Sequence, residues 1–244
     1  MEEISEHETP QERQERIKFR VSRFIEDKLI QAVRLRWEAV QSGNDIDIVQ
    51  CLQNVWPEND GAAWQRKPRF TVSHLDEVFS VRFEGESNEY DSAARLMTIA
   101  VGNLRRATTL EESEGVLLGV IEAVYHEAEH IYNPGSGLEP VDIPETIEYL
   151  GNPGEIEAHG RQFAYRYRRE FPGEPFDVLK MAKLSEKIKN SGKGNRYYNY
   201  FVAFADPIKQ QSYKDFGDVQ CIYEKIVEAT KRHLQILSAH AEEK

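Results

Sequence analysis

The stretch VYHEAEHIY (residues 124–132) ends a run of apolar residues that recur at spacings of three and four. This spacing predicts an amphipathic helix with one face in the core. Thr109 and Glu112 match a capping box, which predicts where the helix begins, and the turn-forming stretch NPGSG (133–137) predicts where it ends. The apolar positions of this helix are Val116, Leu117, Val120, Ile121, Val124, Ala128 and Ile131.

Three residues of this stretch form the pattern H-E-x-x-H. His126 and His130 are four residues apart, so they share a helix face and can bind one metal ion. Glu127 points beside that ion, where it can take a proton from a metal-bound water. The pattern therefore predicts one Zn²⁺ with two histidine ligands and a glutamate as general base. Glu129 adds a charge inside the motif, and we expect it to flank the metal or to face water.

The next predicted helix offers a third ligand, which a catalytic zinc usually has. It begins with GNPGEIEAHG (151–160), which contains Glu155, Glu157 and His159. Helical periodicity places Glu155 and His159 on one face and Glu157 about 160 degrees away from them. The spacing leaves two alternatives: Glu155 together with His159, or Glu157 alone.

Together, the two motifs resemble those of gluzincin metallopeptidases, and especially of small metallopeptidases from phage and bacterial genomes. The resemblance covers residues 110–170 and implies that Glu155 is the third ligand. His159 stands where these enzymes usually carry an aspartate that supports a zinc-bound histidine, so it is either such a support or an alternative ligand. The resemblance implies a zinc-dependent hydrolase, a metallopeptidase in which zinc-bound water activated by Glu127 attacks a peptide carbonyl of a peptide or protein substrate.

The order of elements along the chain is helix, small sheet, then helices, which indicates an α+β fold rather than alternating β-α-β units. With the resemblance, it predicts a mostly helical zincin-like domain over residues 16–244, with a small antiparallel sheet beside the H-E-x-x-H helix. The expected parts are a polar tail (1–15), a long helix (16–41), the sheet region (66–104), the active-site helices (109–171) and the C-terminal helices (176–240).

Other residues are weaker candidates for the site. Tyr197 and Tyr198 could stabilise an oxyanion, as a donor in such enzymes does, although packing is the commoner role of a tyrosine cluster. We expect no ligand role for His74 or His233.

Composition limits the function classes. The 244 residues carry a net charge of -11, which does not favour binding of nucleic acid through bulk electrostatics. No apolar run reaches the roughly 18 residues that a membrane span needs. The acidic, polar start does not resemble a signal peptide, and two cysteines do not make a disulfide framework. We expect a cytoplasmic protein, or a virion component if a phage encodes it.

Two rival hypotheses belong to other classes. The first is a non-catalytic structural or partner-binding protein of a phage or bacterium, which retains a zincin fold and contacts a protein partner through its terminal helices. The second is a di-iron helical bundle, because Glu127 and His130 match half of its signature. A bundle of this kind needs a second Glu-x-x-His, which the chain lacks.

Overall fold

A computed structural model describes residues 9–56, 69–73, 81–84, 96–132, 151–190 and 216–239. The chain divides into two compact units, residues 1–132 and residues 133–244. Helices make up most of the described residues, which confirms the helix-rich class. A single domain over residues 16–244 stays a prediction. None of the helices in these described ranges is long and apolar enough to cross a membrane.

The first unit opens with helix α1, Pro10–Gln41. Its first turn is closed by a capping box, in which the Glu12 backbone N–H donates to Thr9 Oγ1 at 3.2 Å and the Thr9 N–H donates to the Glu12 carboxylate at 2.8 Å. Pro10 follows the cap, at a position where a helix needs no N–H donor. The helical pattern read from the sequence between about Pro10 and Val40 is therefore confirmed, and the first turns of α1 overlap the predicted polar tail (1–15), because the pattern Thr-x-x-Glu already starts a helix there.

The short helix α2, Ile48–Val55, is not among the helices predicted from the sequence. Asp47 caps it by accepting a hydrogen bond from the Val49 N–H at 2.8 Å. Its buried residues include Cys51 and Leu52. A helix of two turns is too short for its apolar spacing to stand out in the sequence.

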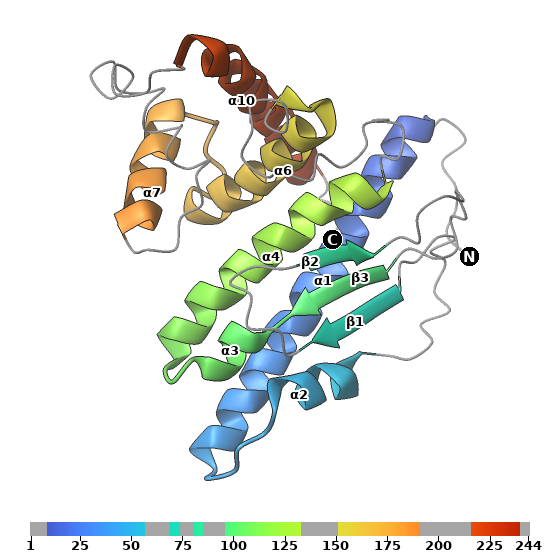
Figure 1. Cartoon of the computed structure of the whole chain (residues 1–244), viewed down its shortest axis with the longest axis vertical. Coiled ribbons are helices and arrows are strands. Elements are labelled where there is room, and N and C mark those ends of the chain that lie inside the picture. The colour runs from blue at the N-terminus through green and yellow to red at the C-terminus, as the bar shows by residue number, and fades with distance from the viewer. Residues whose placement is uncertain are drawn as a thin grey trace. The chain divides into compact units, whose positions relative to one another are not determined.

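Three strands form one sheet in the order β1-β3-β2: β1 is Arg69–Ser73, β2 is Val81–Glu84 and β3 is Leu96–Ala100 (Figure 1). Strand β2 pairs antiparallel with β3, whereas β1 pairs parallel with β3. The prediction of an antiparallel sheet is thus wrong for one of the two pairs. Parallel neighbours need a crossover connection of a dozen residues or more, and the segment 74–95 has that length.

Helix α3, Gly102–Arg106, follows β3 directly and lies partly inside the predicted sheet region. Arg36 of α1 donates to the carbonyl oxygens of Leu104 at 3.3 Å and of Arg105 at 3.1 Å. These bonds satisfy carbonyl groups that the end of a helix leaves without an intrahelical donor.

Helix α4, Leu110–Tyr132, carries the H-E-x-x-H motif. The predicted capping box is confirmed, because the Glu112 N–H donates to Thr109 Oγ1 at 3.1 Å and the Thr109 N–H donates to the Glu112 carboxylate at 3.3 Å. Helices α1 and α4 lie side by side, and α4 also contacts β2 (Figure 1). The core between the two helices includes the buried side chains of Ile25, Leu29 and Val124.

The second unit consists, in its described part, of helices α6, Pro153–Glu170, α7, Val178–Asn190, and α10, Phe216–Ala239. Helices α6 and α10 pack against each other. A Cβ atom built on Gly160 would lie 2.5 Å from Ala229 Cβ, so the two backbones approach too closely for any side chain at this position.

We expect Gly160→Ala to destabilise the protein by about 1–3 kcal/mol, since overpacking at a tight helix contact outweighs the helix propensity gained over glycine. Gly151→Ala is the matched control, because its added Cβ would meet Ile222 at 3.5 Å, an ordinary contact distance. Urea unfolding of both variants measures the difference. Equal stability of the two variants would contradict the close approach of α6 and α10.

Candidate metal centre

The two histidines of the H-E-x-x-H motif converge on α4. His126 Nε2 lies 3.2 Å from His130 Nε2, and the ring centroids are 4.9 Å apart with an interplanar angle of 69°. Two nitrogen ligands bound tetrahedrally to one zinc ion, at about 2.0–2.1 Å each, lie about 3.3–3.4 Å apart. The observed separation therefore fits two ligands of a single ion.

The additional charge of the motif is balanced inside the first unit. Lys18 of α1 donates to the Glu129 carboxylate at 2.5 Å and to the Glu15 carboxylate at 2.8 Å. The Lys18 and Glu129 side chains are only 2% and 3% exposed, so this is a buried ion pair. The expectation that Glu129 flanks the metal or faces water is therefore replaced by a structural role against α1.

A second polar contact joins the same two helices one turn earlier. The Tyr125 hydroxyl donates to the buried carboxylate of Glu26 at 3.1 Å. By helical periodicity, Tyr125 and Glu129 lie on one side of His126, and Glu127 lies on the other. The contacts with α1 thus fix the rotation of α4 about its axis and direct Glu127, which is half-buried, away from the α1 side.

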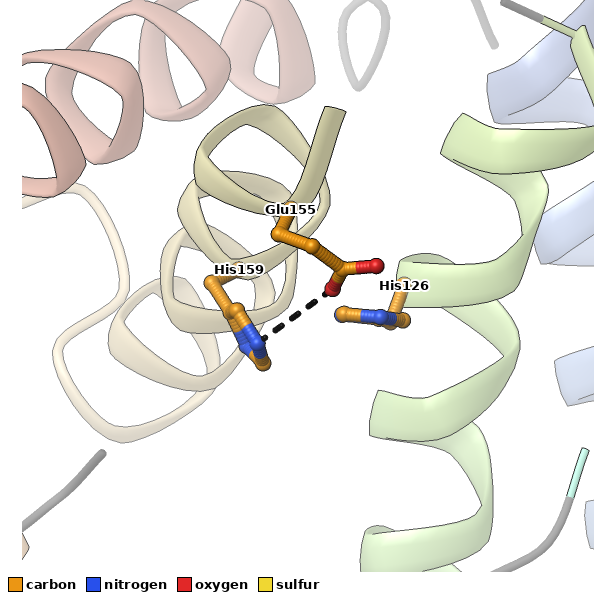
Figure 2. Close-up of side chains that lie close together, drawn as sticks. All are labelled: His126, Glu155 and His159. Carbon is orange, nitrogen blue, oxygen red and sulfur yellow. Dashed lines mark ion pairs between the residues drawn. The ribbon is translucent and has the colours of Figure 1, made fainter. Parts of the chain in front are cut away.

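The two remaining candidate ligands lie together on α6. Asn152 caps this helix by accepting a hydrogen bond from the Gly154 N–H at 2.8 Å, and Glu155 follows in the first turn. Glu155 Oε2 lies 3.7 Å from His159 Nε2, as the dashed line in Figure 2 shows. Figure 2 also draws His126 on its own helix, α4. His159 is buried, and its Nδ1 lies 3.2 Å from Gln162 Oε1.

Glu157 points to a different partner. Its carboxylate accepts a hydrogen bond from His233 Nε2 at 3.0 Å and another from Arg232, both on α10. Burial raises the pKa of Glu157, but the hydrogen bonds from His233 and Arg232 outweigh it and lower the pKa from 4.5 to about 2. Of the two alternatives that the spacing left open, this geometry favours Glu155 with His159.

The other predicted candidates divide into two groups. Tyr197, Tyr198 and His74 lie outside the described residues. His233 is buried on α10, where its Nε2 lies 3.0 Å from the Glu157 carboxylate.

One residue that contacts the motif was missed from the sequence, Lys18, whereas helical periodicity already places Gln162 on the face of Glu155 and His159. Lys18 lies in the apolar stripe of α1, three residues before Val21 and seven before Ile25. A lysine in such a stripe needs a buried acidic partner, so this signal was available. Gln162 lies one turn after His159, a spacing that lets the two side chains meet.

We expect Lys18→Met to destabilise the full chain, freed of metal by a chelator, by about 3–5 kcal/mol, because it leaves Glu129 buried without its cationic partner. The double substitution Lys18→Met with Glu129→Gln should recover much of this loss. Lys28→Met, on the same helix but half-exposed, is the control. Urea unfolding at neutral pH gives all four values. A double variant as unstable as Lys18→Met alone would contradict the ion pair.

Glu157 gives a prediction for acidic pH. Because its pKa is lowered in the folded state, the carboxylate stabilises the fold above about pH 4.5, and this contribution is lost as the pH falls toward about 2. At about pH 6 the wild type should exceed Glu157→Gln by about 1–2 kcal/mol, after allowance for solvent screening. Urea unfolding of the metal-free chains at about pH 6 and about pH 3 should show the gap closing. A gap that stays constant over this range would count against the Glu157 contacts.

No model of a known protein family matches this chain, and no curated protein or solved structure was found to match it.

Proposed function

We propose that the protein is a zinc-dependent hydrolase, specifically a metallopeptidase, with His126, His130 and Glu155 as zinc ligands and Glu127 as general base. The observation that carries this proposal is the convergence of the two Nε2 atoms of the H-E-x-x-H motif to 3.2 Å. A zincin-like fold, with a sheet beside the motif helix, belongs to the same proposal. The contact between α4 and β2 supports it.

The donor set fits zinc. Two imidazole nitrogens and one carboxylate oxygen are a ligand combination of catalytic zinc sites. When bound, zinc lowers the pKa of a coordinated water to about 7 and polarises a carbonyl group. The separate pairs on α4 and α6 offer two donors each, and one ion with at least three protein ligands needs both pairs.

The residues of the chain have distinct tasks in this proposal. Glu127 takes the proton of the attacking water and passes it to the leaving amine nitrogen of the peptide. Its position next to His126, on the side of α4 opposite the α1 contacts, suits this role. Glu129 is separated from the chemistry, because Lys18 holds its carboxylate.

The test compares zinc content with hydrolysis. We expect the wild type to bind one zinc ion and to cleave a mixed-sequence peptide library, with cleavage read from new termini by mass spectrometry. Glu127→Gln should retain zinc and lose at least about 100-fold in rate, since general base catalysis contributes about 10²–10⁴-fold. Zinc retained with unchanged cleavage in this variant would remove Glu127 as the base.

A matched pair on α6 tests the third ligand. We expect Glu155→Gln to lose zinc and Glu157→Gln to keep it, because α10 already engages the Glu157 carboxylate. The reverse result would transfer the ligand role to Glu157. A wild type that binds zinc but cleaves no peptide in the library would instead favour the partner-binding protein.

A further inference from the structure

The His159 side chain is held on two sides within α6. Its Nδ1 lies 3.2 Å from Gln162 Oε1, and its ring stacks on Phe163 with centroids 5.9 Å apart and an interplanar angle of 25°. The His159 and Gln162 side chains are both buried. The ring plane and one of its two nitrogens are therefore fixed by neighbours one turn further along the helix.

The contact with Gln162 sets the tautomer of the imidazole. An amide oxygen only accepts hydrogen bonds, so Nδ1 of His159 must donate, and the proton lies on Nδ1. In the neutral ring, Nε2 then carries a lone pair. This lone pair faces the Glu155 carboxylate, whose Oε2 lies 3.7 Å away (Figure 2). A metal ion placed between these two atoms would be bound by both of them.

We infer that His159 is itself a metal ligand through Nε2, beside Glu155, and that Gln162 is the residue that positions it. The inference rests on the metal centre of the proposed function. It differs from the role that the resemblance to gluzincins implies, in which the residue at this place supports a ligand rather than binding the metal. Metal-bound histidines usually donate their other N–H to an oxygen acceptor, and Gln162 supplies that acceptor.

The side chains of Glu155, His159 and Gln162 lie on a different face of α6 from the side chains that pack against α10. Glu157 and Gly160 face α10, through His233 and Ala229. By periodicity, Glu155, His159 and Gln162 lie on the opposite face of the helix. With His159, the proposed centre would have four protein donors, so a coordinated water would be a fifth ligand, a coordination number that zinc sites reach.

The first experiment reads the tautomer in the full chain freed of metal. We expect ¹⁵N NMR of the imidazoles above pH 8 to show the proton of His159 on Nδ1, with the signal assigned by its loss in His159→Ala. Gln162→Leu removes the acceptor and should shift the proton to Nε2. Gln162→Glu keeps an oxygen acceptor and should restore the wild-type tautomer. A wild-type His159 with its proton on Nε2 would overturn the inference.

The second experiment measures metal binding by the same chains. We expect Gln162→Leu to weaken zinc affinity about 10–100-fold, as loss of a supporting contact does, and Gln162→Glu to bind nearly as the wild type. His159→Ala should weaken zinc more and change the visible spectrum of the Co²⁺-substituted protein. Glu157→Gln, on the same helix, is the control and should leave affinity and spectrum unchanged. Circular dichroism and urea unfolding show which variants are folded.

The possible outcomes distinguish the role of His159 from the proposed metal centre on which it rests. A wild type that binds neither zinc nor Co²⁺ would overturn the metal centre and the role of His159 together. A wild type that binds zinc, with folded His159→Ala showing the same affinity and Co²⁺ spectrum, would overturn only the role of His159. Loss of metal in Gln162→Leu without rescue in Gln162→Glu would show that Gln162 acts through packing and would remove its positioning role.

Discussion

The buried ion pair between Lys18 and Glu129 is the constraint on which the geometry of the first unit depends. Both side chains are nearly inaccessible to solvent, and the pair joins α1 to the last turns of α4. A buried pair of this kind adds little net stability compared with apolar side chains of similar size. Its effect is directional, because any rotation of α4 about its axis would leave one buried charge without the other. The Tyr125–Glu26 bond applies the same restriction one turn earlier.

In the second unit, a different set of contacts fixes the rotation of helix α6 about its axis. On one face of α6, Gly160 allows the α10 backbone to come close, and Glu157 bonds to Arg232 and His233. Together these contacts fix which face of α6 meets α10. The face with Glu155 and His159 follows from that choice, since it lies on the opposite side of the same helix. In each unit, packing on one face of a helix determines the direction of the candidate ligands.

Features that depend on neighbouring residues were predictable from the sequence. The capping box at Thr109 and Glu112, the helix that carries the motif, and the convergence of His126 with His130 all follow from spacings within one or two turns. Features that depend on distant residues were not. The partner of Glu129 is 111 residues away, and the partners of Glu157 are 75 and 76 residues away.

The same reason explains the error in the sheet and why the spacing alone left the choice of ligand open. Alternation of apolar residues predicts a strand but does not say which strand lies between the other two, so the parallel pairing of β1 with β3 was missed. Periodicity placed Glu155 and Glu157 on different faces of α6. Only the position of α10 shows which face is already occupied.

The arrangement of glutamates has a consequence for a metal site in an acidic chain. The stretches HEAEH and EIEAH contain four glutamates in total, and any carboxylate close to a divalent ion is a competing ligand. In the structure, Lys18 engages Glu129, while Arg232 and His233 engage Glu157. These basic partners commit two of the four carboxylates to packing between helices. The other two, Glu127 and Glu155, are those to which the proposed chemistry gives a task. Pairing surplus carboxylates with basic side chains of neighbouring helices is a physical means by which a Glu-rich helix could still present a defined metal site.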